Sequence, residues 1–217
     1  MKTMTISLRT TIVTIVLTGL IYPFAMTGLA QVLFPWRANG SLVSDEKGTV
    51  VGSELIAQGF ANPAYLQPRP SAAGDKGYDP TSSGGSNLGT TSKKLQDRVA
   101  GDLKRLKQEN PDATGPVPVE LVTTSGSGLD PHLSPQGALW QLPRVAKARG
   151  ISPERVRAVI EQNVEGRTFG ILGEPRVNVL LVNVALDRQF GRPAPLPPQE
   201  KKDTKEDSNK ANATAAP

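Results

Sequence analysis

An uncharged, mostly apolar segment near the N-terminus predicts that part of this chain lies in a membrane. No charged residue occurs between Arg9 and Arg37, and residues 12–34 are predominantly apolar. About 20 helical residues, each rising about 1.5 Å, cross a hydrocarbon core of roughly 30 Å. Pro23 lies near the middle of the segment, where a membrane helix survives with a kink because neighbouring groups satisfy the freed carbonyl. The pattern predicts one transmembrane helix over residues 12–34.

A cleaved secretory signal is the alternative interpretation of the same segment, with residues 28–30 as a small-residue cleavage site. Residues 31–34 continue the apolar run past that site, which favours a retained anchor. Both interpretations export the rest of the chain. Lys2 and Arg9 make the leading flank positive, so residues 1–11 are expected to stay in the cytoplasm. We therefore expect the following domain on the periplasmic or extracellular side of the cell (inner) membrane.

The predicted span contains no ionisable residue, so we do not expect it to conduct ions alone. Its small residues Gly19, Ala25 and Gly28 would let another helix approach closely. These three residues are candidate contacts with a partner helix.

Residues 37–191 are long enough to form one packed domain, and residues 192–217, which carry no large apolar residue after Leu196, are expected to be a disordered tail. The fold class is α+β: a single N-terminal transmembrane helix, one mixed α/β soluble domain and the tail. The first expected elements are a hairpin around residues 45–48, a short helix capped by Ser53, and an irregular folded segment over 61–91 anchored by Tyr65, Arg69 and Tyr78. They are followed by a helix that Ser92 opens and that ends before Pro111, a strand over 117–122, a helix from Ser134 to Gly150 that Pro143 kinks, and a helix after Ser152. Residues 177–186 are apolar, but their periodicity does not distinguish strand from helix.

Composition excludes several kinds of site. The chain has no cysteine and one histidine, so it has no disulfide, no thiolate nucleophile and no site with several Cys or His metal ligands; we expect no metal. The net charge of +5 is spread along the chain, which is not the basic patch of a nucleic-acid-binding protein.

The densest polar cluster is the loop over residues 123–132. A hydrolase would use Ser125 or Ser127 as nucleophile and His132 as base, but Asp130 and His132 flank a proline and no nucleophile elbow is present. The glycines of the loop also allow an anion-binding nest, and a purely structural loop braced by Asp130 is the simplest interpretation. The glycine-rich run over 83–89 lacks the lysine of a phosphate-binding loop.

Two charged segments have structural explanations. Arg144, Lys147 and Arg149 are expected to face outward near a helix C-terminus, where positive charge complements the helix dipole. Residues 173–178 are either a functional turn or a charged loop before a buried element.

Six motifs taken in order resemble one family. The chain carries GSELIAQ (52–58), RPSAA (69–73), SGGSNLG (83–89), LVTTSGSGLDPHLSP (121–135), RVAKARG (144–150) and GEPRVNVLLVNVALD (173–187) behind one span. This arrangement closely resembles the C subunit of the Kdp-type potassium-transporting ATPase, and the resemblance runs from the membrane helix to Asp187. Glu120 departs from the family's aspartate, Thr90 and Thr91 follow the SGGSNLG motif, and the tail from Arg192 is added.

The resemblance implies a subunit that is not an enzyme by itself and has no catalytic residue. It would assemble and stabilise the channel-like potassium-selective subunit, the P-type ATPase subunit and a small membrane subunit of a high-affinity potassium uptake complex. The interface candidates outside the span are Arg69, Ser83, Gly84, Gly85, Ser125, Gly126, Ser127, Gly128, Asp130 and His132. The alternative is an exported or membrane-anchored binding module unrelated to transport.

The family is also described as a catalytic chaperone that raises the ATP affinity of the catalytic subunit. Gln141 corresponds to its proposed nucleotide contact, so ATP would bind only in complex with the catalytic subunit. The expected export of the domain conflicts with direct contact, because ATP is inside the cell. An effect on ATP affinity would then pass through subunit contacts that differ between pump conformations.

Overall fold

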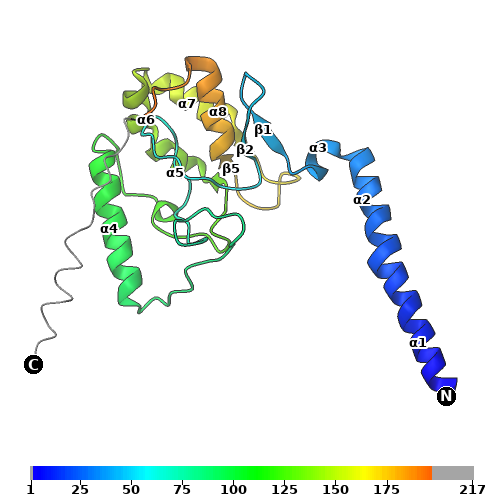
Figure 1. Cartoon of the computed structure of the whole chain (residues 1–217). Coiled ribbons are helices and arrows are strands. Elements are labelled where there is room, and N and C mark those ends of the chain that lie inside the picture. Colours follow the sequence, from blue (N-terminus) through cyan, green and yellow to red (C-terminus); the bar gives the residue numbers. More distant parts are fainter. Residues whose placement is uncertain (1, 197–217) are drawn as a thin grey trace, which may run out of the picture.

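The computed structural model describes residues 2–196, and its N-terminal region is one long helix (Figure 1). The helix comprises α1 (Lys2–Ile15), a π-helical segment η1 (Val16–Ile21) and α2 (Tyr22–Leu33). It is long and apolar enough to cross a membrane, and none of its residues is buried within the chain. Instead of starting at residue 12, the helix already runs from Lys2. The short helix α3 (Pro35–Ala38) follows it.

Pro23 is accommodated by the π-helical segment that precedes it. Proline has no N–H group, so the carbonyl four residues earlier loses its usual donor. The wider hydrogen-bonding pattern of η1 lies directly on the N-terminal side of Pro23. The Thr18 hydroxyl also donates to the Thr14 carbonyl at 2.7 Å.

The predicted hairpin is confirmed as β1 (Leu42–Ser44) paired antiparallel with β2 (Val50–Ser53). The helix predicted after Ser53 is wrong, because Ser53 Oγ accepts from the Leu55 amide and donates to the Gly40 carbonyl, which holds a tight turn. The Ala57 amide then donates to the Leu129 carbonyl of a distant loop rather than to the carbonyl four residues back.

The core forms where a small sheet meets four helices, which confirms the mixed α/β domain. The sheet has the order β3 (His132–Leu133), β5 (Arg176–Asn178), β4 (Val164–Glu165), and all pairs are antiparallel. The helices are α5 (Pro135–Trp140), α6 (Leu142–Arg149), α7 (Pro153–Gln162) and α8 (Val179–Phe190). The fully buried side chains of this core include Leu66, Leu133, Val145, Val156, Ile160, Val177, Val182 and Leu186.

Two local predictions differ from the structure, which also decides residues 177–186, where the sequence does not distinguish strand from helix. Residues 117–122 contain a 3-10 turn, η2 (Val119–Leu121), rather than a strand. Val119 and Leu121 would lie on the same face of a strand, whereas the turn buries Leu121 and leaves Val119 exposed. The helix predicted from Ser134 to Gly150 is instead two helices, α5 and α6, which are separated at Gln141. Helix α6 is capped at its C-terminus by Gly150, which has φ of +65°. Residues 177–186 divide at Asn178 into the end of strand β5 and the beginning of helix α8. The Asn178 side chain caps α8 by accepting from the Leu181 amide.

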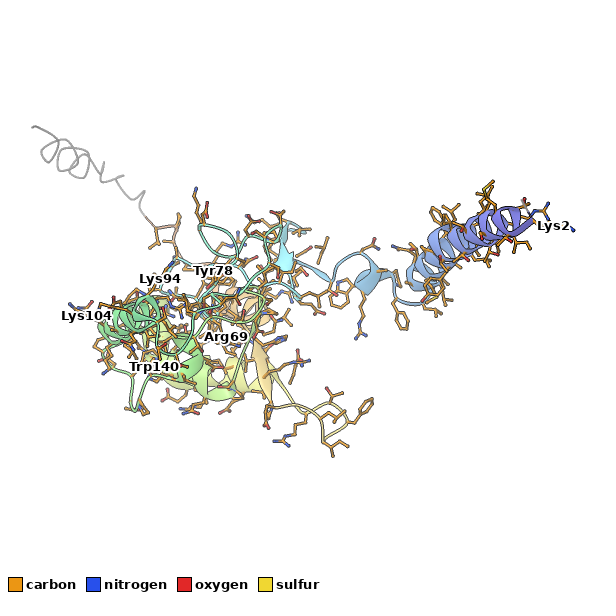
Figure 2. The ribbon with its side chains drawn as sticks, turned by 90° about the horizontal axis from the view of Figure 1, so that it is seen from below. Lys2, Arg69, Tyr78, Lys94, Lys104 and Trp140 are labelled. Carbon is orange, nitrogen blue, oxygen red and sulfur yellow. The ribbon has the colours of Figure 1, made fainter. Side chains whose placement is uncertain are left out.

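The remaining helix, α4 (Lys93–Glu109), confirms the predicted helix after Ser92 and lies on the outer side of the domain (Figures 1 and 2). Residues 61–91 contain no regular helix or strand, also as predicted. Of the predicted tail, residues 192–196 run along the domain, where Arg192 pairs with Asp45 at 3.3 Å. Residues 197–217 lie outside the described residues.

Candidate functional site: a platform of interlocked loops

The two glycine-rich loops singled out in the sequence are hydrogen-bonded to each other. The Ser127 carbonyl accepts from the Gly84 amide at 2.8 Å and from Ser83 Oγ at 3.0 Å. Thr124 Oγ1 donates to Ser86 Oγ at 3.1 Å. Together with residues 69–73, loops 83–86 and 124–130 form one surface, which we call the loop platform.

Arg69 and Asp130 connect two segments of the platform. Arg69 Nη1 lies 3.2 Å from Asp130 Oδ2, and Arg69 Nη2 donates to the Thr124 carbonyl at 3.2 Å. Asp130 Oδ1 accepts from the His132 amide at 3.0 Å and lies 3.5 Å from His132 Nδ1. The His132 side chain, followed by its backbone amide and Arg69, lowers the pKa of Asp130 against the opposing effect of burial. The carboxylate is therefore held ionised as a structural brace.

The glycines of the platform have different steric surroundings. Gly128 has φ of +68°, and a Cβ atom there would lie 2.7 Å from the Ala73 nitrogen and from the Gly84 carbonyl oxygen. A Cβ on Gly85 would lie 3.0 Å from the Gly126 carbonyl oxygen, whereas one on Gly126 would meet no atom within 4 Å. The close approach of the loops thus depends on Gly128, and Gly126 faces outward.

The bonding of two backbone amides and of His132 bears on both chemical interpretations, the anion-binding nest and the hydrolase site. The Gly128 amide donates to the Ser125 carbonyl, and the Leu129 amide donates to Ser127 Oγ, so neither is directed at an anion. Among residues 2–196, no hydrogen bond joins His132 to Ser125 or Ser127. The bonds that these groups make are those of a braced structural loop.

Tyr78 connects the platform to the irregular segment that precedes α4. Its hydroxyl donates to the Arg69 carbonyl at 2.9 Å, and its amide donates to Ser71 Oγ at 2.8 Å. Ser71 Oγ in turn donates to the Gly128 carbonyl at 2.6 Å. Burial raises the pKa of Tyr78 to about 12, so the phenol stays protonated and keeps its donor. Figure 2 shows Arg69 and Tyr78 within the domain, with Lys94 and Lys104 on the outer helix.

The side chain of Gln141 is buried and hydrogen-bonded. Its Oε1 accepts from the Gln67 amide at 2.9 Å and from Arg144 Nη2 at 2.8 Å, and its Nε2 donates to the Gln67 carbonyl at 2.9 Å. The residue is 2% exposed. Gln141 therefore holds the chain two residues before Arg69.

The backbone of residues 62–67, which we call the strap, forms hydrogen bonds with further buried side chains. Arg144 donates to the carbonyls of Pro63 and Tyr65 at 2.7 and 3.0 Å. Asn183 of α8 bonds both the amide and the carbonyl of Leu66. Burial lowers the pKa of Arg144 to about 10, which still leaves it cationic at neutral pH.

The expected outward orientation of Arg144 and Arg149 is wrong. Arg144 is buried under the strap, and the Arg149 side chain is 3% exposed, 2.7 Å from Asp187 and beside the Tyr65 ring. The carbonyls of an irregular segment need donors, and these guanidinium groups supply them. Lys147 is exposed as expected, with its amine 3.3 Å from Asp112.

Two site features lie elsewhere or were missed by sequence reasoning. Gly19, Ala25 and Gly28 lie on the N-terminal helix, away from the platform. Glu120 accepts from both the amide and the hydroxyl of Ser134 at the start of α5. The Ser134–Pro135 pair was a sequence signal for the start of α5, but no sequence signal indicated that the distant Glu120 carboxylate bonds to Ser134.

These features define a class: within residues 2–196 the protein has one candidate membrane helix and one mixed α/β domain that presents a braced loop surface. The family model for KdpC, the c chain of the K+-transporting ATPase, matches residues 4–188. The chain therefore belongs to the KdpC family of potassium-transporting ATPase subunits.

Relatives in three bacteria support this assignment. The potassium-transporting ATPase KdpC subunit of Myxococcus xanthus is 66% identical over 191 residues, covering 88% of this chain and 89% of that protein. The subunit of Rhodospirillum rubrum is 56% identical over 174 residues, with 80% and 89% covered. That of a Caulobacter species is 57% identical over 175 residues, with 81% and 88% covered.

Proposed function

We propose that this chain is a non-catalytic accessory subunit that assembles and stabilises the channel-like and P-type ATPase subunits of a potassium uptake complex. The loop platform carries the proposal. Its polar side chains, including Ser71, Ser83 and Arg69, bond to the backbone of neighbouring loops. Such bonding makes a fixed surface, and a preformed surface loses little entropy when a partner binds.

The test places a bulky charge on that surface in the full chain, expressed together with the other pump subunits. Gly126 is exposed and has open space around it, so Gly126→Glu adds a side chain without forcing the loops apart. We expect this variant to lower both the recovery of the other subunits and potassium uptake by about tenfold, as loss of an interface hot spot does.

Gly101→Glu is the matched control, because Gly101 lies on the exposed side of α4 and its Cβ position is equally open. It introduces the same charge and should leave recovery and uptake unchanged. Equal behaviour of the two variants would reject the platform as the subunit contact.

We further propose that the domain lies outside the cytoplasm and affects ATP affinity only through subunit contacts. The positive flank formed by Lys2 and Arg9 supports this orientation. The bonding of the Gln141 amide to Gln67 and Arg144 supports indirect action, because no free polar atom of that side chain is exposed to a nucleotide.

Orientation is measurable with a single cysteine, since the chain contains none. Lys104 is exposed on α4 and lies outside the loop platform, so Lys104→Cys should react with an impermeant thiol reagent applied to intact cells. Labelling only after lysis would place the domain inside and would restore direct contact with ATP as an explanation.

A further inference from the structure

The loop between β4 and β5 presents three large apolar side chains to solvent. Phe169, Ile171 and Leu172 are 88%, 74% and 57% exposed. Residues 166–175 form this loop, which we call the apolar tip, and Figure 2 shows it projecting from the body of the domain. A soluble surface rarely leaves adjacent large apolar side chains uncovered unless they contact something else.

The backbone of the apolar tip is held in one conformation. Thr168 and Leu172 exchange two hydrogen bonds, at 2.8 and 3.0 Å, and the Ile171 amide donates to the Thr168 carbonyl at 3.3 Å. Phe169 and Gly170 both have positive φ, +54° and +77°. A positive φ is unfavourable for an aromatic residue, so the turn keeps Phe169 at the apex against its own backbone preference.

The charges beside the tip are paired with each other. Arg167 Nη2 lies 2.7 Å from Glu174 Oε2, and Arg176 Nε lies 2.9 Å from Glu165 Oε2. Segments that bind anionic membrane surfaces combine apolar residues with an excess of Lys or Arg. The tip has no such excess, because two arginines face two glutamates. Because the charges beside the tip neutralise each other and its apex is apolar, the tip is suited to an apolar pocket on a protein.

We propose that the apolar tip is a docking contact that inserts Phe169, with Ile171 and Leu172, into an apolar pocket on another subunit of the same potassium-transporting complex. The proposal rests on the proposed function, since it presupposes that the chain assembles with those subunits. A rigid apex with an aromatic anchor is the arrangement that concentrates binding energy in a few side chains.

The experiment coexpresses the full chain with the other pump subunits and purifies it in detergent. The readout is the recovery of the other pump subunits with this chain. The double variant Phe169→Ser with Ile171→Ser should reduce subunit recovery by about tenfold. Val119→Ser is the matched control, because Val119 is also apolar and 72% exposed but lies on η2. The control should leave recovery unchanged.

A photoreactive benzophenone side chain at position 169 supplies a second readout that does not depend on loss of binding. We expect a covalent adduct with a pump subunit. Adducts with lipid alone would overturn the proposal in favour of a membrane contact, and full recovery with the double variant would overturn it as well. If the unaltered chain recovers no pump subunit, the proposed function fails rather than this contact.

Discussion

Gln141 illustrates how one buried amide holds an irregular backbone. Replacing it in Gln141→Ala leaves the amide and carbonyl of Gln67, and one bond of Arg144, without their partner. Unsatisfied buried polar groups cost about 1–3 kcal/mol each, so we expect the free energy of unfolding to fall by about 2–4 kcal/mol. Chemical denaturation of the full chain measures this. A variant of unchanged stability with weakened ATP affinity of the pump would instead support a direct nucleotide role.

Gly128 and Gly126 form a matched pair for testing the contact between the two platform loops. Gly128→Ala adds a Cβ that would lie 2.7 Å from two backbone atoms at a positive φ, so the loops must separate. We expect about 2–4 kcal/mol of destabilisation, since backbone strain and overpacking add. Gly126→Ala has open space and should change stability by less than about 0.5 kcal/mol. Thermal unfolding compares the two, and equal losses would contradict the interlocked arrangement.

Asp130 makes platform stability depend on acid. Its pKa is lowered below 3.8 in the folded chain, so its contribution is complete above the unfolded value and disappears as pH falls through the folded value. Asp130→Asn should be less stable than the unaltered chain at pH 6, and this difference should shrink below about pH 4. Urea unfolding at the two pH values tests this. A constant difference would mean that the carboxylate charge does not brace the loops.

At the scale of elements, α5 depends on a capping group far away in the chain. Glu120 accepts from the amide and hydroxyl of Ser134, and Ser134 Oγ accepts from the Gly137 amide. Glu120→Ala should cost about 1–2 kcal/mol, a typical value for loss of a helix cap. Thermal unfolding should shift by about 2–8 °C, whereas Glu46→Ala in the exposed hairpin turn should have little effect. A larger effect of Glu46→Ala would show that charge, not capping, matters.

Elements marked by local chemistry were predictable from the sequence, and those decided by distant partners were not. Ser-Pro starts identified α5 and α7, and Asp45 with Gly48 identified the hairpin. The helix after Ser53 failed because the Ala57 amide bonds a remote loop. For the site, the glycine-rich runs identified the loop platform residues, but nothing local to Gln141 indicated the buried strap that it bonds.

At the scale of the whole molecule, the N-terminal helix and the domain are structurally separate. No residue of α1, η1 or α2 is buried by the domain. Trp36, whose indole N–H donates to the Leu42 carbonyl, lies on α3, after the end of α2. A variant lacking residues 1–33 should therefore unfold within about 2 °C of the full chain in the same detergent, because exposed groups contribute little to stability.

The same truncation should nevertheless prevent association with the membrane subunits, even when the domain is exported with a cleavable signal. The small residues of the candidate span would be absent, and the domain would lose the local concentration that a membrane anchor would provide. Copurification with the pump subunits measures this loss. Undiminished copurification would assign all of the binding energy to the domain, whereas loss of cooperative unfolding would show that the helix is part of the fold.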